Sequence, residues 1–472
     1  MIELTYINLN DFLSRSINVG REGEVLDQSF SPGNLVKIYH GENKKGINVA
    51  GMFLPQVLEE YKKINRMRAL IRKLFLNRRI YRRSTFKGRV VKLYEMKRNY
   101  KRIKNEKIVF YMEDVSKVIG SKHFSFKVDK LPYKKNGKDV YRTGSDAASF
   151  FAEKQIQRNI KRTYSVKQAD RDIIVPQLIS ILSDKVPKLV MKADIEAFYE
   201  SIDRDLLVKK LNEKPVLSLS TRKLITKMFR KYEALSGEER GIPRGIGISA
   251  YLAELYLKTF DEEIKRIDNL IYYARYVDDI VIVVSIKSGE GEEAIKKKVG
   301  SLLDKEKLSL NQIKTEVFSC LNGNETFSFE YLGYKFNKAE AGLKVLISDK
   351  KIEKYKSRIS SSIDKFKKNS IKQPKKAKKE LFLRLSFLTT NTSLSNNKGN
   401  AVVGVYNTNK WITETGPLVH LDNILKGRIA SLKDEKIKQK ASKFSFRKGF
   451  SERRYTRFTS KDLETIVKAW KQ

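Results

Sequence analysis

Two adjacent aspartates, Asp278 and Asp279, interrupt the otherwise apolar stretch YARYVDDIVIVV at residues 273–284. The runs on either side are rich in β-branched and aromatic residues and are typical of two buried strands joined by a turn. Neighbouring carboxylates in apolar surroundings repel each other and lose hydration, so their pKa values rise or a cation neutralises them. The pair therefore indicates either an exposed turn without a special role or a metal site.

The charge of the chain is the second strong constraint. Lys and Arg number 97 against 55 Asp and Glu, which gives a formal net charge of +42, while 40% of the residues are hydrophobic. That hydrophobic fraction, over 472 residues, predicts globular domains with real cores and not a disordered basic tail. Such an excess of positive charge favours a polyanionic partner, most often nucleic acid, over a merely solvated basic surface.

The composition disfavours several other chemistries. Cys320 is the single cysteine, which excludes an intrachain disulfide and a zinc site built from cysteines. The histidines His40, His123 and His420 are widely spaced and show no metal-ligand pattern. The first residues lack a secretion signal, and no run is long enough to span a membrane. We therefore expect a cytoplasmic protein with no membrane partner.

A basic segment from Tyr61 to Lys107 contains scattered aromatic residues and only two acids, Glu95 and Glu106. Basic side chains can follow a nucleic-acid backbone while aromatic rings stack on bases, which is how single strands are bound. The same pattern is also typical of helices whose aromatic residues face the core and whose charges face water. The two interpretations are compatible, and both are kept.

Between residues 188 and 350 the pattern becomes a mixture of strands and helices. KLVMKADI predicts a strand that ends at Asp194, and DRDLLVKKL predicts a helix with Asp203 as its N-cap. SAYLAELYLKTFDEEI predicts one helix capped by Ser249, and FEYLGYKF (Phe329–Phe336) predicts a strand or hairpin. This order predicts an α+β domain, after which the chain becomes helical and strongly basic.

Aspartates that are distant in sequence can share one site in such a domain. Asp194 at a strand end and Asp278 at a facing hairpin turn can meet at one edge of a sheet. Magnesium prefers oxygen ligands and keeps several waters, so a few carboxylates on rigid elements suffice to bind it. Nucleotidyl transfer uses two such ions, one for the attacking 3′-hydroxyl and one for the triphosphate.

Five motifs occur in an order that resembles the palm of reverse transcriptases. They lie between residues 192 and 336 and read ADIEAFYESI, GIPRGIGIS, YARYVDDIV, LNQIKT and FEYLGY. FYESI, GIPRG and RYVDD resemble the prokaryotic retron, abortive-infection and defence-associated lineages more than viral enzymes. The resemblance implies an α+β right-hand polymerase. Its expected parts are a basic N-terminal and fingers region (1–130), fingers and palm (131–350), and a helical thumb with a basic C-terminal extension (351–472).

The resemblance implies that Asp194, Asp278 and Asp279 are the catalytic aspartates. Asp194 and Asp278 are the expected direct metal ligands, with Asp279 as a further ligand or a support. The backbone carbonyl of Ile195 is an additional expected ligand. Tyr199 matches the steric-gate aromatic residue that excludes a 2′-hydroxyl, although a core aromatic residue has the same sequence pattern.

Further residues match motifs for nucleotide and primer. Lys314 matches the lysine beside the triphosphate, where it could protonate the leaving pyrophosphate. Arg244 replaces the Gln of many relatives and could contact a triphosphate, a template phosphate or a local carboxylate. Gly245 would let the template–nucleotide pair approach closely. Arg171, in RDIIVP, is the expected triphosphate-binding fingers residue, with YRTGSD (141–146) as an alternative landmark. Gly333 fits a tight turn that grips the primer end.

Together these roles imply an RNA-directed DNA polymerase that uses two Mg²⁺ ions to add deoxynucleotides from dNTPs. The expected partners are an RNA template, which we expect to be a noncoding RNA, and the DNA product. The expected biological role is antiphage defence. Three alternatives stay open: protein-primed or untemplated synthesis by the same site, an RNA-dependent RNA polymerase, and an inactive nucleic-acid-binding scaffold. Assembly with a second copy of the chain or with a second defence protein is also open.

Overall fold

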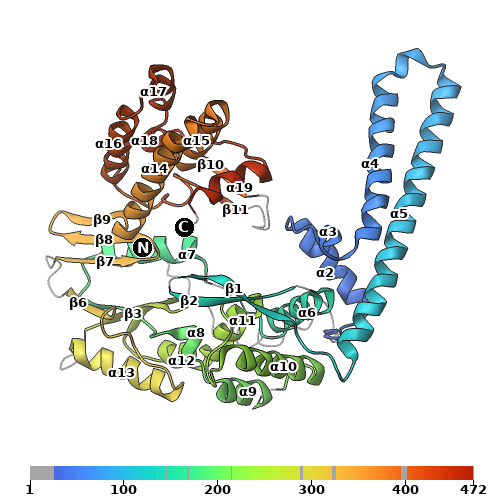
Figure 1. Ribbon diagram of the computed structural model, residues 1–472. Helices are drawn as coiled ribbons and strands as arrows, with labels where there is room; N and C mark the ends of the chain where they lie inside the picture. Colours follow the sequence, from blue (N-terminus) through green and yellow to red (C-terminus); the bar gives the residue numbers. More distant parts are fainter. Residues whose placement is uncertain are drawn as a thin grey trace. The chain divides into compact units, whose positions relative to one another are not determined.

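The structure is a computed structural model that describes residues 26–135, 137–144, 146–166, 169–213, 215–286, 291–320, 326–394 and 401–470. The N-terminal residues that the secretion-signal prediction concerns lie outside these ranges. Helices and antiparallel sheets alternate along the chain, which confirms the α+β prediction (Figure 1). None of the helices in these ranges is long and apolar enough to cross a membrane.

Two units make up the chain. The first combines residues 1–168, 197–259 and 306–308, and the second combines 169–196, 260–305 and 309–472. The elements of the first unit are α2 (Pro32–Lys44), α3 (Val49–Phe53), α4 (Pro55–Leu76), η1 (Arg78–Ile80), α5 (Arg83–Gly120), β1 (Val128–Lys135), β2 (Lys138–Thr143), α6 (Ala147–Thr163), α8 (Phe198–Ser201), α9 (Arg204–Glu213), α10 (Leu219–Ser236) and α11 (Gly247–Tyr256). Helix α12 (Lys258–Lys265) runs across the boundary.

A four-stranded antiparallel sheet in the order β4-β5-β3-β6 forms the centre of the second unit. Its strands are β3 (Lys188–Asp194), β4 (Leu270–Tyr276), β5 (Asp279–Ser285) and β6 (Glu316–Cys320). Helix α7 (Arg171–Ser183) packs apolar side chains against β3 and β5, and α13 (Glu292–Lys305) contacts β3 and β6. Both faces are therefore covered, which explains why β5 is apolar and buried from Ile280 to Val284.

The rest of the second unit is a smaller sheet and a helical bundle. The sheet has the order β7-β8-β9, with β7 (Phe327–Tyr331), β8 (Tyr334–Ala339) and β9 (Gly342–Ile347). A separate apolar core joins α14, α15, α16, α17 and α18. The remaining bounds are α14 (Asp349–Ser370), α15 (Pro374–Thr389), β10 (Asn391–Leu394), β11 (Ala401–Gly404), α16 (Gly416–Ala430), α17 (Glu435–Ala441), α18 (Phe446–Ser451) and α19 (Ser460–Lys468).

The helix predicted to start at Ser249 differs from the structure in two ways. It begins at Gly247 and is interrupted at Leu257, between α11 and α12. The Ser249 hydroxyl donates to the Pro243 carbonyl (2.7 Å) and does not cap the helix. Instead, the buried Glu153 carboxylate accepts the Gly247 amide N–H at 3.0 Å. The cap comes from a distant helix, so the local sequence could not reveal it.

Candidate active site

Asp194 and Asp279 are direct partners across two neighbouring strands of the central sheet. The register of β3 and β5 pairs Asp194 with Asp279, at the end of β3 and the start of β5. Side chains opposite each other on antiparallel strands lie about 5 Å apart at Cβ. Asp278 occupies the two-residue turn between β4 and β5, and its carbonyl accepts the Ile195 amide N–H at 3.2 Å. Asp194 thus lies at the same sheet edge as Asp278 and Asp279, although it is far from them in sequence.

The turn that carries Asp278 is held in a strained conformation. Val277 has a φ of 63°, a left-handed value that is costly for a β-branched residue. The buried Arg275 guanidinium donates to the Val277 carbonyl at 2.9 Å and binds both Asp261 carboxylate oxygens at 2.8 and 2.7 Å. Arg275 therefore fixes the turn from behind. It was missed at the sequence level because its partner, Asp261, is in another element.

The carboxylates repel one another in this geometry. Burial, followed by the charges of Asp278 and Asp194, raises the pKa of Asp279 to about 6. The Lys314 ammonium lies 3.0 Å from an oxygen of the buried Asp194 carboxylate, and this hydrogen bond raises the pKa of Lys314. Lys192 donates to the Lys314 carbonyl at 3.0 Å and so holds its turn in place. The predicted Lys314 thus belongs to the same cluster as the aspartates.

The donor set fits a hard divalent cation. Carboxylate oxygens are the ligands that Mg²⁺ prefers, and burial together with the charges of Asp278 and Asp194 raises the pKa of Asp279. The Lys314 ammonium supplies a close positive charge at Asp194. Within the described ranges no three acidic, histidine or cysteine side chains converge closely enough to enclose a metal ion by themselves. Substrate oxygens and water would have to complete the coordination.

Replacing Asp279 tests this repulsion without any substrate. The folded chain binds more protons than the unfolded chain between pH about 4 and about 6, because the pKa of Asp279 rises from 3.8 to about 6 on folding. The free energy of unfolding of the metal-free protein therefore falls across that range and stays lower at neutral pH. Asp279→Asn should raise the free energy of unfolding by about 2 kcal/mol at pH 7 and very little at pH 4. Urea unfolding at the two pH values measures this difference.

The exposed Asp268 offers a matched control for this measurement. Asp268→Asn makes the same chemical change and should leave the urea midpoint unchanged at both pH values. An Asp279→Asn protein with the same stability change at pH 4 and pH 7 would show that its carboxylate is not repelled.

Tyr199 and Arg244 form a separate cluster in the first unit. Phe198 is 1% exposed and occupies the core, whereas Tyr199 is only half-buried. The Arg244 guanidinium lies over the Tyr199 ring, 4.9 Å from its centroid, and donates to both Glu200 oxygens at 3.1 and 3.2 Å. Of the three partners considered for Arg244, the structure shows the local carboxylate. This pairing fixes the orientation of the Tyr199 ring.

The two predicted glycines lie in tight backbone geometry. Gly245 has a φ of 98°, and a Cβ atom there would come within 2.6 Å of the Tyr141 carbonyl. Glycine is thus required by the neighbouring strand β2. Leu332 and Gly333, with φ values of 49° and 79°, form the two-residue turn of the β7–β8 hairpin. This confirms the predicted hairpin and its tight turn.

Arg171 is the first residue of α7, and its contacts in the described part of the chain do not include the three active-site carboxylates. Its guanidinium is 5.7 Å from the centroid of the Tyr334 ring. It lines a cavity together with Lys351, and none of the three aspartates belongs to that cavity. The structure therefore does not bring Arg171 together with the other predicted nucleotide-binding residues of the second unit.

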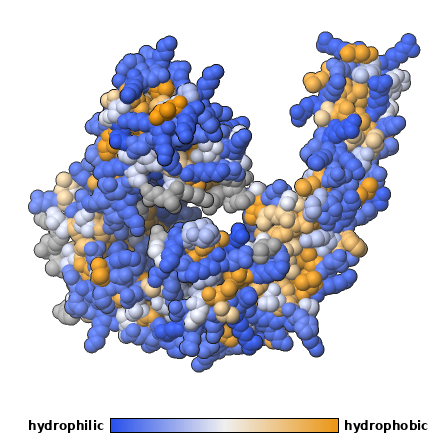
Figure 2. All heavy atoms as spheres, in the orientation of Figure 1, coloured by the Kyte–Doolittle hydropathy of each residue, from blue (hydrophilic) through white to orange (hydrophobic). Residues whose placement is uncertain are grey.

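The basic segment of the first unit forms two long helices, α4 and α5, that lie side by side (Figure 1). Thirteen Lys and Arg and no acid lie between Tyr61 and Tyr94. Figure 2 shows hydrophobic side chains gathered along this hairpin among hydrophilic ones. The aromatic rings lie beside cations of the hairpin itself, in the pairs Lys63–Tyr100, Arg78–Phe86, Arg89–Tyr81, Lys97–Tyr94 and Lys104–Tyr61. The helices are confirmed, but the expectation that their aromatic residues face the core is wrong: none of these rings is buried, and Phe75 is 50% exposed.

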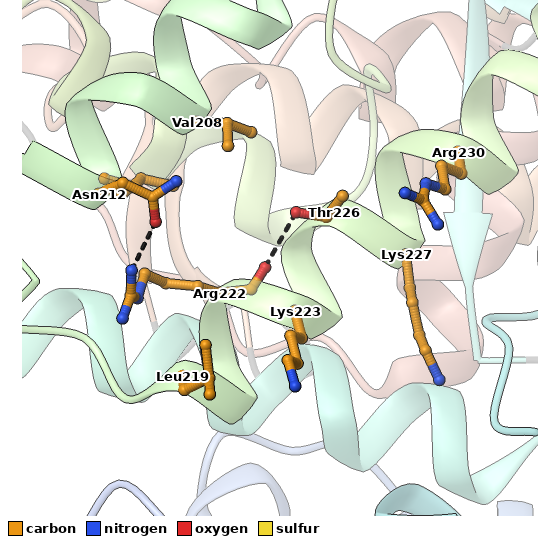
Figure 3. A pocket seen from close by; sticks show the side chains of 9 residues that line it. Val208, Asn212, Leu219, Arg222, Lys223, Thr226, Lys227 and Arg230 are labelled. Carbon is orange, nitrogen blue, oxygen red and sulfur yellow. Dashed lines mark hydrogen bonds between the residues drawn. The ribbon is translucent and has the colours of Figure 1, made fainter. Parts of the chain in front are cut away.

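A basic pocket of about 400 Å³ lies between α9 and α10 (Figure 3). It contains four cationic side chains and no carboxylate. Arg222 already donates to Asn212 at 2.5 Å, and Lys227 donates to the carbonyls of Lys122 and Phe124 at 3.1 and 2.9 Å. With no acidic residue, this pocket offers no metal ligands and is not the candidate active site.

A carboxylate cluster at the end of a covered antiparallel sheet, with a lysine beside it, is the arrangement of a palm-type nucleotidyltransferase. The comparison with known families agrees: residues 134–336 match the family "Reverse transcriptase (RNA-dependent DNA polymerase)". The matched segment includes all three aspartates. The chain thus carries a reverse transcriptase domain and is an RNA-directed DNA polymerase. No curated protein matches the chain.

Proposed function

We propose that the chain is a magnesium-dependent reverse transcriptase whose chemistry takes place at Asp194, Asp278 and Asp279. The observation that carries this proposal is the pairing of Asp194 with Asp279 across β3 and β5, with Asp278 in the adjoining turn. Asp194 and Asp278 would hold two Mg²⁺ ions, with Asp279 and the Ile195 carbonyl beside them. When bound, such ions lower the pKa of the primer 3′-hydroxyl and neutralise the triphosphate.

The chain's own residues would position the substrates around these carboxylates. The hydrogen bond to Asp194 raises the pKa of Lys314. The ammonium therefore stays protonated near neutral pH and can give a proton to the leaving pyrophosphate. Tyr199, held by Arg244, would exclude the 2′-hydroxyl, and Gly245 would let the template–nucleotide pair approach closely. Gly333 would contact the primer end. We leave Arg171 out of the nucleotide site because of its place beside Tyr334.

The likeness of FYESI, GIPRG and RYVDD to defence-associated lineages supports a role in antiphage defence with a noncoding RNA. In this proposal residues 1–130 include the basic N-terminal and fingers region, 131–350 the fingers and palm, and 351–472 the helical thumb and its basic extension. Primer extension on an RNA template, followed by sequencing of the copurifying nucleic acid and of the DNA made, tests this proposal. DNA that begins covalently attached to the protein, or that copies no template, would favour the protein-primed or untemplated alternative.

We further propose that the α4–α5 hairpin binds the RNA through its phosphates. Arg78, Arg79, Arg82 and Arg83 are exposed at the turn between these helices, while the aromatic rings are already paired with cations. Replacing all four with Gln should make the plot of log affinity against log salt shallower by about 3, since each phosphate contact contributes about 0.7 to 0.9. Filter binding at several salt concentrations measures the slope.

Arginine-to-lysine changes at the same four positions keep the charge and serve as the control. Their salt slope should equal that of the unmodified protein. A glutamine variant with an unchanged slope would place the RNA elsewhere on the chain.

A further inference from the structure

The second unit contains a cavity of about 630 Å³ whose lining is separate from the three aspartates. We name it the basic cavity and define it by Arg171 of α7, Lys351, Lys354 and Arg358 of α14, Phe387 of α15 and the C-terminal Trp470. Its volume lies in the range of small-molecule sites. None of the three active-site aspartates contributes to its wall.

Three cations of the basic cavity, Arg171, Lys351 and Arg358, face a lining without acidic residues. No Asp or Glu lines it, and Arg171, Lys351 and Arg358 make no ion pair among the described residues. The nearest acid along α7, Asp172, is 2.8 Å from Lys410 instead. The Lys351 ammonium donates to the Thr408 carbonyl at 2.7 Å and lies 5.5 Å from the centroid of the Tyr334 ring. Partly buried cations without anions are unfavourable, so this wall is suited to a ligand that brings several negative charges.

The electrostatics of Lys351 agree with an anion-binding role for this wall. Burial, together with the charges of Arg171 and Lys354, lowers the pKa of Lys351 to about 7. Burial also lowers the pKa of Arg358. An anion placed between these groups would restore the full charge of Lys351 and gain attraction from each neighbour.

The rest of the lining is mainly apolar. Trp470 is fixed by three contacts: Arg358 lies 4.8 Å from its ring centroid, Phe387 lies 5.7 Å away, and its Nε1–H donates to Ser362 at 3.2 Å. Phe387, Val403 and Val467 continue this surface. A ligand that matches both walls has a multiply charged phosphate group at one end and a flat, largely apolar group at the other.

We propose that the basic cavity binds a phosphorylated nucleoside, with its phosphate at Arg171, Lys351 and Arg358 and its base and sugar against the Phe387–Trp470 wall. The guanidinium forks of the two arginines suit phosphate oxygens, and the volume accommodates a single nucleotide. Both a free nucleotide and the phosphorylated end of a strand present this chemistry. The site is distinct from the catalytic carboxylates and does not depend on their activity.

Calorimetric titration of the full-length Asp278→Asn protein in EDTA tests this proposal, because the active site then lacks metal. The probes are dTMP, a ten-nucleotide DNA with a 5′-phosphate, and the same DNA with a 5′-hydroxyl. We expect one molecule of a phosphorylated probe per chain, bound at least tenfold more weakly after Lys351→Met. Tighter binding of dTMP would identify a free nucleotide as the ligand, and tighter binding of the 5′-phosphorylated strand would identify a strand end.

A second variant and a matched control keep the test decisive. Val403→Trp fills the cavity without changing any charge and should also weaken binding at least tenfold. Lys223→Met removes one charge from the separate pocket of Figure 3 and should leave binding unchanged. Absence of binding by any phosphorylated probe, or equal binding by all three variants, would overturn the proposal while leaving the polymerase site unaffected.

Discussion

Asp278→Asn should reduce nucleotide incorporation by at least about a thousandfold while RNA affinity stays within about twofold of the unmodified protein. Asp278 lies in the turn next to the Asp194–Asp279 pair, so its charge acts on any cation at this sheet edge. An asparagine has nearly the same size but cannot neutralise a cation. Single-nucleotide extension of an annealed primer, in magnesium and with filter binding of the RNA in parallel, measures both quantities.

Asp268→Asn controls for the chemical change itself, because Asp268 is exposed and belongs to the same unit. Its incorporation rate should equal that of the unmodified protein. An Asp278→Asn enzyme that retains more than a tenth of the rate would mean that metal is bound by other residues. Loss of RNA binding together with activity would point to a folding defect and not to catalysis.

Tyr199→Ala should lower the preference for deoxynucleotides over ribonucleotides by about tenfold to a hundredfold. The ring is held between the core residue Phe198 and the guanidinium of Arg244, so it presents a fixed surface to a ligand. Its removal leaves room for a 2′-hydroxyl without touching the carboxylates. The ratio of kcat/KM for dTTP and UTP on the same RNA template measures the change.

Tyr199→Phe keeps the ring and loses only the hydroxyl, so its selectivity should match that of the unmodified enzyme. Unchanged selectivity in Tyr199→Ala would remove this residue as the gate. It would also reopen the RNA-dependent RNA polymerase alternative, because the aromatic ring is the main argument against it.

Much of the candidate site could be predicted from local sequence. A strand ending at Asp194 and a hairpin turn at Asp278 follow from runs of apolar residues that stop at a carboxylate. The two-residue turn at Gly333 follows from a glycine between two β-rich runs. The position of Lys314 was expected from its motif, but its hydrogen bond to Asp194 was not.

What the sequence did not reveal are the contacts between distant elements. The Arg275–Asp261 pair behind the active-site turn and the Glu153 cap of α11 each depend on which helices pack together. Periodicity reports the buried face of an element but not its partner. The basic cavity is the extreme case, since α7, α14 and the C-terminal Trp470 meet only in the folded second unit.

The central claim concerns the location of the metal ions, and anomalous X-ray scattering from Mn²⁺ tests it most directly. Crystals of the enzyme with template, primer and a non-hydrolysable dNTP would be grown in Mn²⁺. We expect anomalous peaks about 2.2 Å from carboxylate oxygens of both Asp194 and Asp278. Peaks bound by other residues, or no peak at Asp194 and Asp278 in an enzyme that extends primers in the same buffer, would contradict it.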